Sequence, residues 1–371
     1  MASQASPVLA IVTRDITKYS ETFIHRHALR LNGGRTVVIA LAPCPAPVRP
    51  TLTLENYRKR GGVPMVLGLN ALRQMRRRRL IRQFLKAQGV THVLCEFGYV
   101  ATELERDLKG LDLPVFCMFR GRDSSAQLSS DKYRAALERV LPRLDGIAAV
   151  AQFLLDNLAA RGLRHPRSIV VPSGTDTEAL TPGTPEQGLV FCAGRLVGKK
   201  SPLPLIRAFA RVAEQHDLRL EIAGDGPETE AAHALIAELG LEKRVFLLGR
   251  MPHDALLARM RQAMIYAQHF DTPADGDTEG MPNVIQEAMA CGLPIATTRH
   301  AGIPEHVHDC ETGLLVEPGD ELGLGDALGR LAGDGALRDR LGRAAREHAE
   351  KELEFRRLYK RLEDFMGLHG S

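Results

Sequence analysis

The sequence predicts an α/β protein made of two doubly wound domains, and three observations support that prediction. The chain has 371 residues, too many for one hydrophobic core of ordinary size. Short apolar runs alternate with helical patterns along the chain, which is typical of parallel sheets covered by helices on both faces. Residues 173–188 are rich in Gly, Pro, Thr and Ser, and they form a predicted linker between two such sets.

Each predicted strand is a short run of apolar and β-branched residues, as expected for buried strands. Before the linker these runs are residues 8–13, 36–42, 91–97, 114–121, 146–151 and 168–174; after it they are 189–195, 219–226, 244–250, 264–270, 294–298 and 312–318. Helices are predicted at residues 21–31, 69–87, 131–141 and 337–365, the last of them long and charged. Ligands bind beyond the carboxyl ends of the strands in such sheets, so we expect the site in a cleft between the domains.

The composition is that of a soluble globular protein, with 44% hydrophobic and 25% charged residues. No apolar run is long enough to span a bilayer and residues 1–7 lack the pattern of a signal peptide, so we expect a cytoplasmic location. The six cysteines are scattered without a C-x-x-C pair, which argues against structural zinc and a disulfide framework.

The net charge is +4, and the charged residues are distributed unevenly along the chain. Residues 1–180 carry 27 Lys and Arg against 15 Asp and Glu, whereas the rest carries 22 against 30. Much of the excess lies on the predicted helix that contains Arg73, the run Arg76 to Arg79, and Arg82. This face is either simply solvated or in peripheral contact with anionic membrane at the inner surface. Nucleic acid is not expected, because no nucleic-acid module surrounds the helix.

Two glutamates with different surroundings stand in DTEGMPNVIQEAMACGLP, residues 277–294. Glu279 lies in a predicted loop, whereas Glu287 lies in a predicted apolar helix and needs a partner, since an unpaired buried charge costs roughly several kcal/mol. The helix is predicted to begin near Pro282 and to end before Gly292. Its free N–H groups could hold phosphate while the two carboxylates grip the ends of a nucleotide sugar. The alternative is a surface loop before a helix that happens to carry a Glu.

Two loops that follow predicted strands have compositions suited to a phosphate ligand. GRLVGKKS, residues 194–201, places Arg195, Lys199 and Lys200 where they would either hold a diphosphate or form solvated surface. EIAGDGPE, residues 221–228, is a Gly-rich turn that lacks the third glycine of the dinucleotide fingerprint. A hydride-transfer cofactor is therefore disfavoured.

Metal sites are not expected. The triplet at residues 275–277 resembles the D-x-D motif that holds a divalent metal on a diphosphate, but Arg195 and Lys200 would already neutralise the phosphate. The three histidines of residues 300–308 fit no common zinc pattern, so surface or helix-start histidines are favoured.

The order of these motifs resembles the retaining glycosyltransferases of family 4, which have the GT-B fold, two Rossmann-like domains that face each other across a cleft. SETFI near the N-terminus and GDTEGMPNVIQEAMACGLPIATTRHAGIPE resemble in particular exopolysaccharide transferases of the colanic acid and amylovoran type. The resemblance covers nearly the whole chain. It implies an acceptor-binding domain at residues 1–180, a donor-binding domain at 181–352, and a C-terminal helix at 353–371 that packs back toward the N-terminal domain.

The resemblance also implies a role for each matching residue. Glu287 would bind the ribose hydroxyls, Glu279 would face the donor sugar, and Arg195 and Lys200 would stabilise the leaving diphosphate. The catalytic residues would then be Arg195, Lys200 and Glu279, and the donor-binding residues Gly224, Arg250, Met251, Gly280, Met281, Pro282, Asn283 and Glu287.

One position departs from the family pattern. Many relatives carry a His near the 6-hydroxyl of the donor where this chain has Arg120, in CMFRGRDSS. A guanidinium is always charged and accepts no hydrogen bond, so it cannot replace that His. We expect Arg120 either to favour an acidic sugar or a phosphorylated acceptor, or to pair with Asp123. The predicted acceptor-side or specificity residues are Arg120, Asp123, Ser20 and Glu21.

The resemblance thus implies a retaining, metal-independent hexosyltransferase without a cofactor. Its donor would be a nucleotide sugar, a UDP-sugar in preference to a GDP-sugar, that carries a hexose or an N-acetylhexosamine. Its acceptor would be a hydroxyl of a glycan, a lipid-linked sugar or a small molecule. Two alternatives stay open. A UDP-N-acetylglucosamine 2-epimerase of the same fold would turn over the donor with no acceptor present, and a non-catalytic module would only bind nucleotide sugar or membrane.

Overall fold

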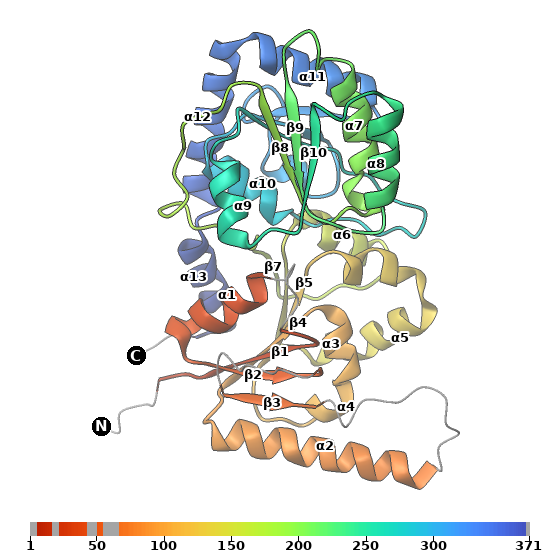
Figure 1. Cartoon of the computed structure of the whole chain (residues 1–371). Coiled ribbons are helices and arrows are strands. Elements are labelled where there is room, and N and C mark those ends of the chain that lie inside the picture. The colour runs from red at the N-terminus through yellow and green to blue at the C-terminus, as the bar shows by residue number, and fades with distance from the viewer. Residues whose placement is uncertain (1–5, 17–21, 43–49, 55–66, 369–371) are drawn as a thin grey trace. The chain divides into compact units, whose positions relative to one another are not determined.

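The computed structural model describes residues 6–16, 22–42, 50–54 and 67–368 (Figure 1). The chain forms two compact units. Unit 1 takes in Met1–Val150, Leu154–Val171 and Tyr359–Ser371, and unit 2 takes in Ala151–Phe153 and Pro172–Leu358. Each unit is built around one sheet whose pairings are all parallel, as the alternation of strands and helices predicts.

Unit 1 contains a seven-stranded sheet in the order β3-β2-β1-β4-β5-β6-β7. Its strands are β1 Leu9–Thr13, β2 Thr36–Ala40, β3 Thr51–Thr53, β4 His92–Glu96, β5 Val115–Phe119, β6 Gly146–Ala149 and β7 Ser168–Val170. The helices before residue 172 are α1 Thr22–Arg30, α2 Leu67–Ala87, α3 Gly98–Glu103, α4 Glu105–Leu108, α5 Asp131–Val140 and α6 Gln152–Ala159. The last helix, α13 Phe355–Met366, places Phe365 against Phe116 of β5, with ring centroids 5.8 Å apart.

Unit 2 contains a six-stranded sheet in the order β10-β9-β8-β11-β12-β13. Its strands are β8 Leu189–Ala193, β9 Arg219–Ala223, β10 Val245–Gly249, β11 Ile265–Gln268, β12 Ile295–Thr298 and β13 Leu314–Val316. Its helices are α7 Pro202–Ala210, α8 Thr229–Glu238, α9 His253–Met260, α10 Asn283–Ala290, α11 Glu321–Gly333 and α12 Gly335–Glu352. Short 3-10 turns occur at Leu31–Gly34, Arg122–Ser124, Ala126–Ser129, Leu141–Arg143, Gly198–Lys200 and Ile303–Glu305.

The sheet of unit 2 is apolar on both faces because successive strand residues point to opposite sides. In β8, Val190 and Cys192 join the core under α7, α8 and α11. Leu189, Phe191 and Ala193 of the same strand join a second core under α9 and α10. Figure 1 shows α7 and α8 on one side of this sheet and α9 and α10 on the other. A continuous apolar run is therefore what a strand covered on both faces requires.

The strand orders place one topological switch point in each sheet, between β1 and β4 in unit 1 and between β8 and β11 in unit 2. At such a point the loops that leave neighbouring strands run to opposite sides and open a crevice beyond the carboxyl ends of the strands. In unit 2 the two loops concerned begin at Gly194, after β8, and at His269, after β11. The three predicted catalytic residues lie on these loops, as do three of the predicted donor-binding residues, Gly280, Met281 and Pro282.

All twelve predicted strands are present in the structure, but one further strand was not predicted and one predicted helix is wrong. Strand β3 is only three residues long, too short to stand out in the sequence. The single long helix predicted at residues 337–365 is wrong, because the chain leaves helical structure between α12 and α13. The backbone N–H of Thr175 donates to the carbonyl of Leu353 at 2.8 Å, and the N–H of Phe355 donates to the carbonyl of Thr175 at 3.0 Å. The predicted linker therefore bonds to the chain where the helix ends.

Candidate donor site in unit 2

The turn after β8 carries the predicted cationic residues. Gly194 has φ +152°, and a Cβ there would lie 2.9 Å from Cδ of Lys200, so a glycine lets Lys200 fold back over the strand end. Arg195 is exposed and forms no ion pair with any residue in the described part of the chain. Its guanidinium is therefore free to take an anionic ligand, whereas Lys200 already has an internal partner.

That partner belongs to a compact cluster of charges between the turn after β8 and the loop after β11. Glu279 Oε1 lies 3.4 Å from Nζ of Lys200 and 3.4 Å from Nζ of Lys199. Lys199 also lies 3.3 Å from Oδ1 of Asp277. The backbone N–H of Asp271 donates to the carbonyl of Lys199 at 3.3 Å, which joins the two loops directly. The structure thus brings Lys200 and Glu279 together at the switch point.

Burial favours the protonated form of Glu279 and raises its pKa, but the positive charges of Lys200 and Lys199 outweigh burial and lower the pKa from 4.5 to about 2. The carboxylate is thus ionised at neutral pH, although only 16% of its side chain is exposed. An anion held between two ammonium groups can orient a neutral sugar through hydrogen bonds without a further counter-ion.

The depressed pKa predicts how the stability of the protein depends on pH. A carboxyl with a pKa near 2 in the folded state and 4.5 in the unfolded state stabilises the fold fully above pH 4.5, and this contribution is lost as the pH falls toward 2. We expect urea unfolding to show a difference between wild type and Glu279→Gln that shrinks between pH 5 and pH 2.5. The exposed control Glu214→Gln should follow wild type at every pH. Parallel curves for wild type and Glu279→Gln would contradict the depressed pKa.

Glu287 has the partner that a buried carboxylate requires. It lies in α10 with 4% of its side chain exposed, and its Oε1 is 2.9 Å from Nε2 of His253, the first residue of α9. Sequence reasoning identified the need for a partner but missed His253. The signal that could have found His253 was its position in the sequence, because it lies two residues after Met251, which was already predicted to be in the site.

The start of α10 has the predicted form at the predicted place. Pro282, with φ −61°, is the residue before the first helical residue, Asn283, and the helix ends before Gly292, whose φ is +70°. The carbonyl of Gly280 accepts from the N–H of Gly302 at 3.0 Å, so the approach to the helix is fixed by the loop after β12. Met281 is 4% exposed and packs in the core under α9 and α10, which leaves backbone rather than side chain for a ligand.

The loops after β9 and β10 are joined to each other. Arg250 is exposed, and its Nη2 lies 3.5 Å from Oδ2 of Asp225; Met251 packs on the core beside it. Gly224 has φ +145°, and a Cβ there would lie 1.9 Å from the carbonyl oxygen of Gly194. Close packing of two backbones therefore explains this glycine, and its contact with the donor stays a prediction.

Residues that were considered as possible metal ligands have other partners in the structure. Asp277, in the D-x-D triplet, is paired with Lys199. His306 Nδ1 lies 3.1 Å from Nε2 of His348, as in an ordinary histidine pair. Within the described residues no group of three or more His, Cys, Asp or Glu side chains is arranged to hold a metal ion.

In unit 1 the predicted pairing of the Arg120 side chain with Asp123 is wrong. The Arg120 guanidinium contacts Oε2 of Glu96, with Nη2 at 2.8 Å and Nε at 2.9 Å, and His27 Nδ1 lies 2.5 Å from the other oxygen of Glu96. Asp123 instead accepts from backbone N–H groups, those of Gly98 at 2.8 Å and Arg120 at 3.0 Å. Asp123 lies close to Arg120 in the sequence and was therefore favoured. The buried carboxylate of Glu96, at the end of β4, pairs with Arg120 instead, because a buried charge without a partner is costly.

The Glu96 carboxylate therefore compensates the charge of Arg120 inside the protein. Burial raises the pKa of Glu96, but Arg120 and His27 lower it to about 2, which keeps the acid ionised beside the guanidinium. Arg120 is 8% exposed. Its predicted preference for an acidic sugar or a phosphorylated acceptor stays a prediction, and this pairing weighs against it. Ser20 and Glu21 lie outside the described residues.

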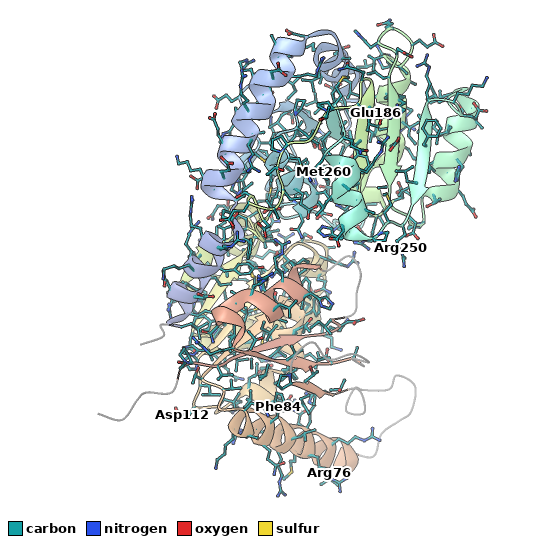
Figure 2. The ribbon with its side chains drawn as sticks, turned by 60° about the vertical axis from the view of Figure 1, so that its left-hand side comes forward. Arg76, Phe84, Asp112, Glu186, Arg250 and Met260 are labelled. Atoms are coloured by element: carbon teal, nitrogen blue, oxygen red, sulfur yellow. The ribbon has the colours of Figure 1, made fainter. Side chains whose placement is uncertain are left out.

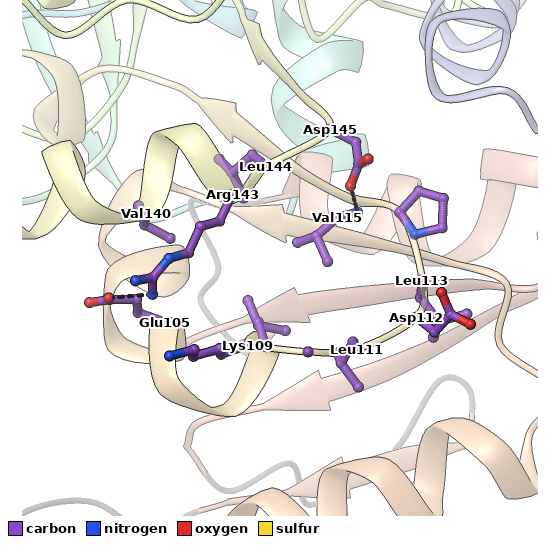
Figure 3. Close-up of a pocket in the computed structure, with 13 residues that line it drawn as sticks. Glu105, Lys109, Leu111, Asp112, Leu113, Val115, Val140, Arg143, Leu144 and Asp145 are labelled. Atoms are coloured by element: carbon purple, nitrogen blue, oxygen red, sulfur yellow. Dashed lines mark hydrogen bonds and ion pairs between the residues drawn. The ribbon is translucent and has the colours of Figure 1, made fainter.

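Two pockets lie at the other ends of the sheets. Figure 3 shows the first, of about 570 Å³, where Arg143 pairs with Glu105 at 2.7 Å and Asp145 accepts from the N–H of Val115 at 2.8 Å. Val115 is the first residue of β5. The second pocket, of about 430 Å³, lies at the starts of β11 and β12 in unit 2. Ligands of doubly wound sheets bind at the carboxyl ends of the strands, so we assign no ligand to either pocket.

Two protein families match the chain. Residues 181–348 match the model described as Glycosyl transferases group 1, and residues 21–179 match the model of Glycosyltransferase Family 4. A GDP-mannose-dependent monoacylated alpha-(1-6)-phosphatidylinositol monomannoside mannosyltransferase of Corynebacterium glutamicum is 30% identical over 249 residues, which are 63% of this chain and 65% of the relative. The amylovoran biosynthesis glycosyltransferase AmsK of Erwinia amylovora is 28% identical over 282 residues, 74% of this chain and 69% of the relative.

The matches extend over different shares of the curated relatives. Those with the strongest sequence matches are covered over 40–65% of their length. The predicted resemblance to transferases of the colanic acid and amylovoran type is confirmed. Among solved structures, that of HepE from Anabaena in complex with UDP and glucose superimposes with a TM-score of 0.80 over 97% of this chain and 99% of that chain, at 17% identity. At that identity the likeness shows the fold, and it confirms the predicted GT-B architecture of two doubly wound domains.

Proposed function

The chain belongs to the group 1 and family 4 glycosyltransferases, and we propose that it is a retaining hexosyltransferase that needs no metal and moves a sugar from a nucleotide sugar to a hydroxyl group. One observation carries the proposal. The exposed Arg195 and the pair formed by Lys200 and Glu279 lie together beyond the carboxyl ends of β8 and β11, where doubly wound sheets bind ligands.

The cations would act on the leaving group. As the bond between sugar and diphosphate breaks, negative charge grows on the phosphate oxygens, and Arg195 and Lys200 are placed to stabilise it. Their positive charges supply what a divalent metal supplies elsewhere. The N–H groups at the start of α10, beyond Gly280 to Pro282, would hold the phosphate, because they have no partner within the helix.

The acids and the remaining residues would position the donor. Glu279 would accept hydrogen bonds from the sugar hydroxyls, Glu287 would accept from the ribose, and Arg250 and Met251 would flank the base. Holding the reactants in a productive geometry accounts for a large part of such catalysis. Acceptor binding by residues 1–180, donor binding by residues 181–352 and the packing of residues 353–371 toward the N-terminal domain belong to the same proposal.

A UDP-sugar is the proposed donor and a GDP-sugar the second choice. HepE is solved with UDP and glucose, which supports a uridine nucleotide in this fold. A relative at 30% identity is named as GDP-mannose-dependent, which supports the other base. The acceptor is proposed to be a hydroxyl of a glycan, a lipid-linked sugar or a small molecule, in keeping with the relatives named for polysaccharide biosynthesis and phosphatidylinositol mannoside.

Contact with anionic membrane through α2 is a further part of the proposal. Arg77 is buried and pairs with Asp107, so it does not belong to the outer face. Arg73, Arg76 and Arg79 are exposed, as are Leu72 and Met75, with 44% and 68% of their surface accessible. Figure 2 shows Arg76 projecting from the outer side of α2. Cations beside exposed apolar side chains suit an anionic lipid surface, which binding to anionic vesicles tests. None of the helices in the described ranges is long and apolar enough to cross a membrane.

Thermal unfolding with a panel of nucleotide sugars tests the donor assignment. We expect one of UDP-, GDP-, ADP- and dTDP-glucose to raise the melting temperature without magnesium, since a ligand at a hundred times its dissociation constant stabilises the fold by about 2.7 kcal/mol. The variant Arg195→Ala should reduce that shift only slightly, because its proposed role lies in the transition state. A shift that requires magnesium would contradict metal independence, and no shift from any donor would contradict the site.

A further inference from the structure

The contact between His253 and Glu287 involves only one of the two oxygens of a buried carboxylate. Nε2 of His253 lies 2.9 Å from Oε1 of Glu287, and the second carboxylate oxygen has no hydrogen-bond partner in the described part of the structure. The two side chains also differ in access, with 39% of His253 exposed against 4% of Glu287. One oxygen is therefore held by the protein while the other remains available.

We propose that His253 is a positioning residue for the nucleotide, which holds Glu287 so that its free oxygen faces the ribose of a nucleoside diphosphate. The inference rests on the proposed function and deepens it. A glutamate side chain has three rotatable bonds, and ordering it on binding costs affinity. A hydrogen bond to one oxygen fixes the carboxylate in advance, so the ribose hydroxyls meet an acceptor that is already oriented.

The local structure makes this contact rigid at both ends. His253 follows Pro252, whose φ of −55° fixes the start of α9. Leu256 and Met260 of α9 pack in the same core as Ile285 of α10. Movement of one helix relative to the other would disturb that core, so the pair is held at constant spacing.

The position of His253 in the chain links two parts of the nucleotide. Arg250 and Met251 are proposed to flank the base, and His253 begins the helix just beyond them. One short segment would then contact the base directly and orient the ribose through Glu287. A nucleoside that displaces this segment would also disturb the ribose contact, which gives His253 an influence on the choice of base.

Nucleotide analogues separate this role from simple charge compensation. The variants are His253→Phe, which removes the hydrogen bond, and His253→Gln, whose amide nitrogen reaches the place of Nε2. We would measure dissociation constants by calorimetry for UDP, GDP and ADP, each beside its 2′,3′-dideoxy counterpart. For the nucleotide that binds, we expect His253→Phe to weaken binding about tenfold and to leave binding of the dideoxy analogue unchanged, with His253→Gln in between. In turnover, the donor KM should rise while kcat stays near its wild-type value.

The control is His233→Phe on α8, an exposed histidine whose replacement should change neither constant. Equal weakening of the ribose and dideoxy forms by His253→Phe would overturn the inference, because the residue would then act only through packing. An unchanged affinity for the natural nucleotide would overturn it as well. If wild type binds none of the three nucleotides, the proposed function itself fails, and that result is distinct from normal wild-type binding that His253 does not influence.

Discussion

We expect Arg195→Ala and Lys200→Ala each to lower kcat by about a hundredfold to a thousandfold, with a donor KM within about threefold of wild type. The reason is that the diphosphate is already anionic in the bound donor and gains further negative charge in the transition state, so the added stabilisation by both cations is largest there. Arg195 is the cleaner variant, because its guanidinium forms no ion pair among the described residues. Lys200 also neutralises Glu279, so its loss removes a partner of the acid as well.

Steady-state kinetics with the donor found in the thermal panel checks this prediction. Lys351→Ala serves as control, since 80% of that side chain is exposed on the outside of α12. Lys200→Arg keeps the charge but not the compact ammonium, and we expect it to recover part of the loss. A variant that raised the KM with kcat unchanged would show that these cations bind the ground state and transition state equally, which would count against a role in departure of the diphosphate.

Much of the fold could be predicted from the sequence because its strands are buried on both faces. Such strands are continuous apolar runs, and runs like residues 189–195 and 264–270 correspond to β8 and β11 of the structure. The same logic located the site, because the loops after these strands have to meet at one edge of the sheet. The shared contact of Lys199 and Lys200 with Glu279 is a consequence of that topology.

The pairings that could not be predicted from the sequence join residues on different secondary-structure elements. Glu287 and His253 lie on two separate helices, and Glu96 and Arg120 lie at the ends of two neighbouring strands. Helical or strand periodicity relates residues within one element and says nothing about pairs between elements. What could be predicted was the requirement: a carboxylate in an apolar segment has to find a cation or a donor. Applied to Glu96, the same rule would have predicted that this carboxylate pairs with Arg120, and that Arg120 is therefore not free to determine substrate specificity.

The second large effect is expected at Gly224. A Cβ there would meet the carbonyl oxygen of Gly194 at 1.9 Å, and the φ of +145° is one that residues with a side chain rarely adopt. Both obstacles are backbone, so no side-chain rotation relieves them. We expect Gly224→Ala to reduce the free energy of unfolding by about 3 kcal/mol or more. Because Gly194 leads into Arg195, the displaced turn should also lower kcat, measured by steady-state kinetics on protein that remains folded.

Gly249→Ala is the matched control, because Gly249 is bridged to Gly224 and its carbonyl accepts from the N–H of Gly224 at 2.7 Å. Gly249 also has a positive φ, +66°, but a Cβ there would meet no atom within 4 Å. This variant should then lose only the free energy of the backbone strain, about 1–2 kcal/mol, and its kcat should stay near the wild-type value. Urea unfolding of the two variants therefore separates strain from collision. Equal losses of stability would mean that the loops after β8 and β9 can move apart, and a donor site that depends on their close contact would no longer be supported.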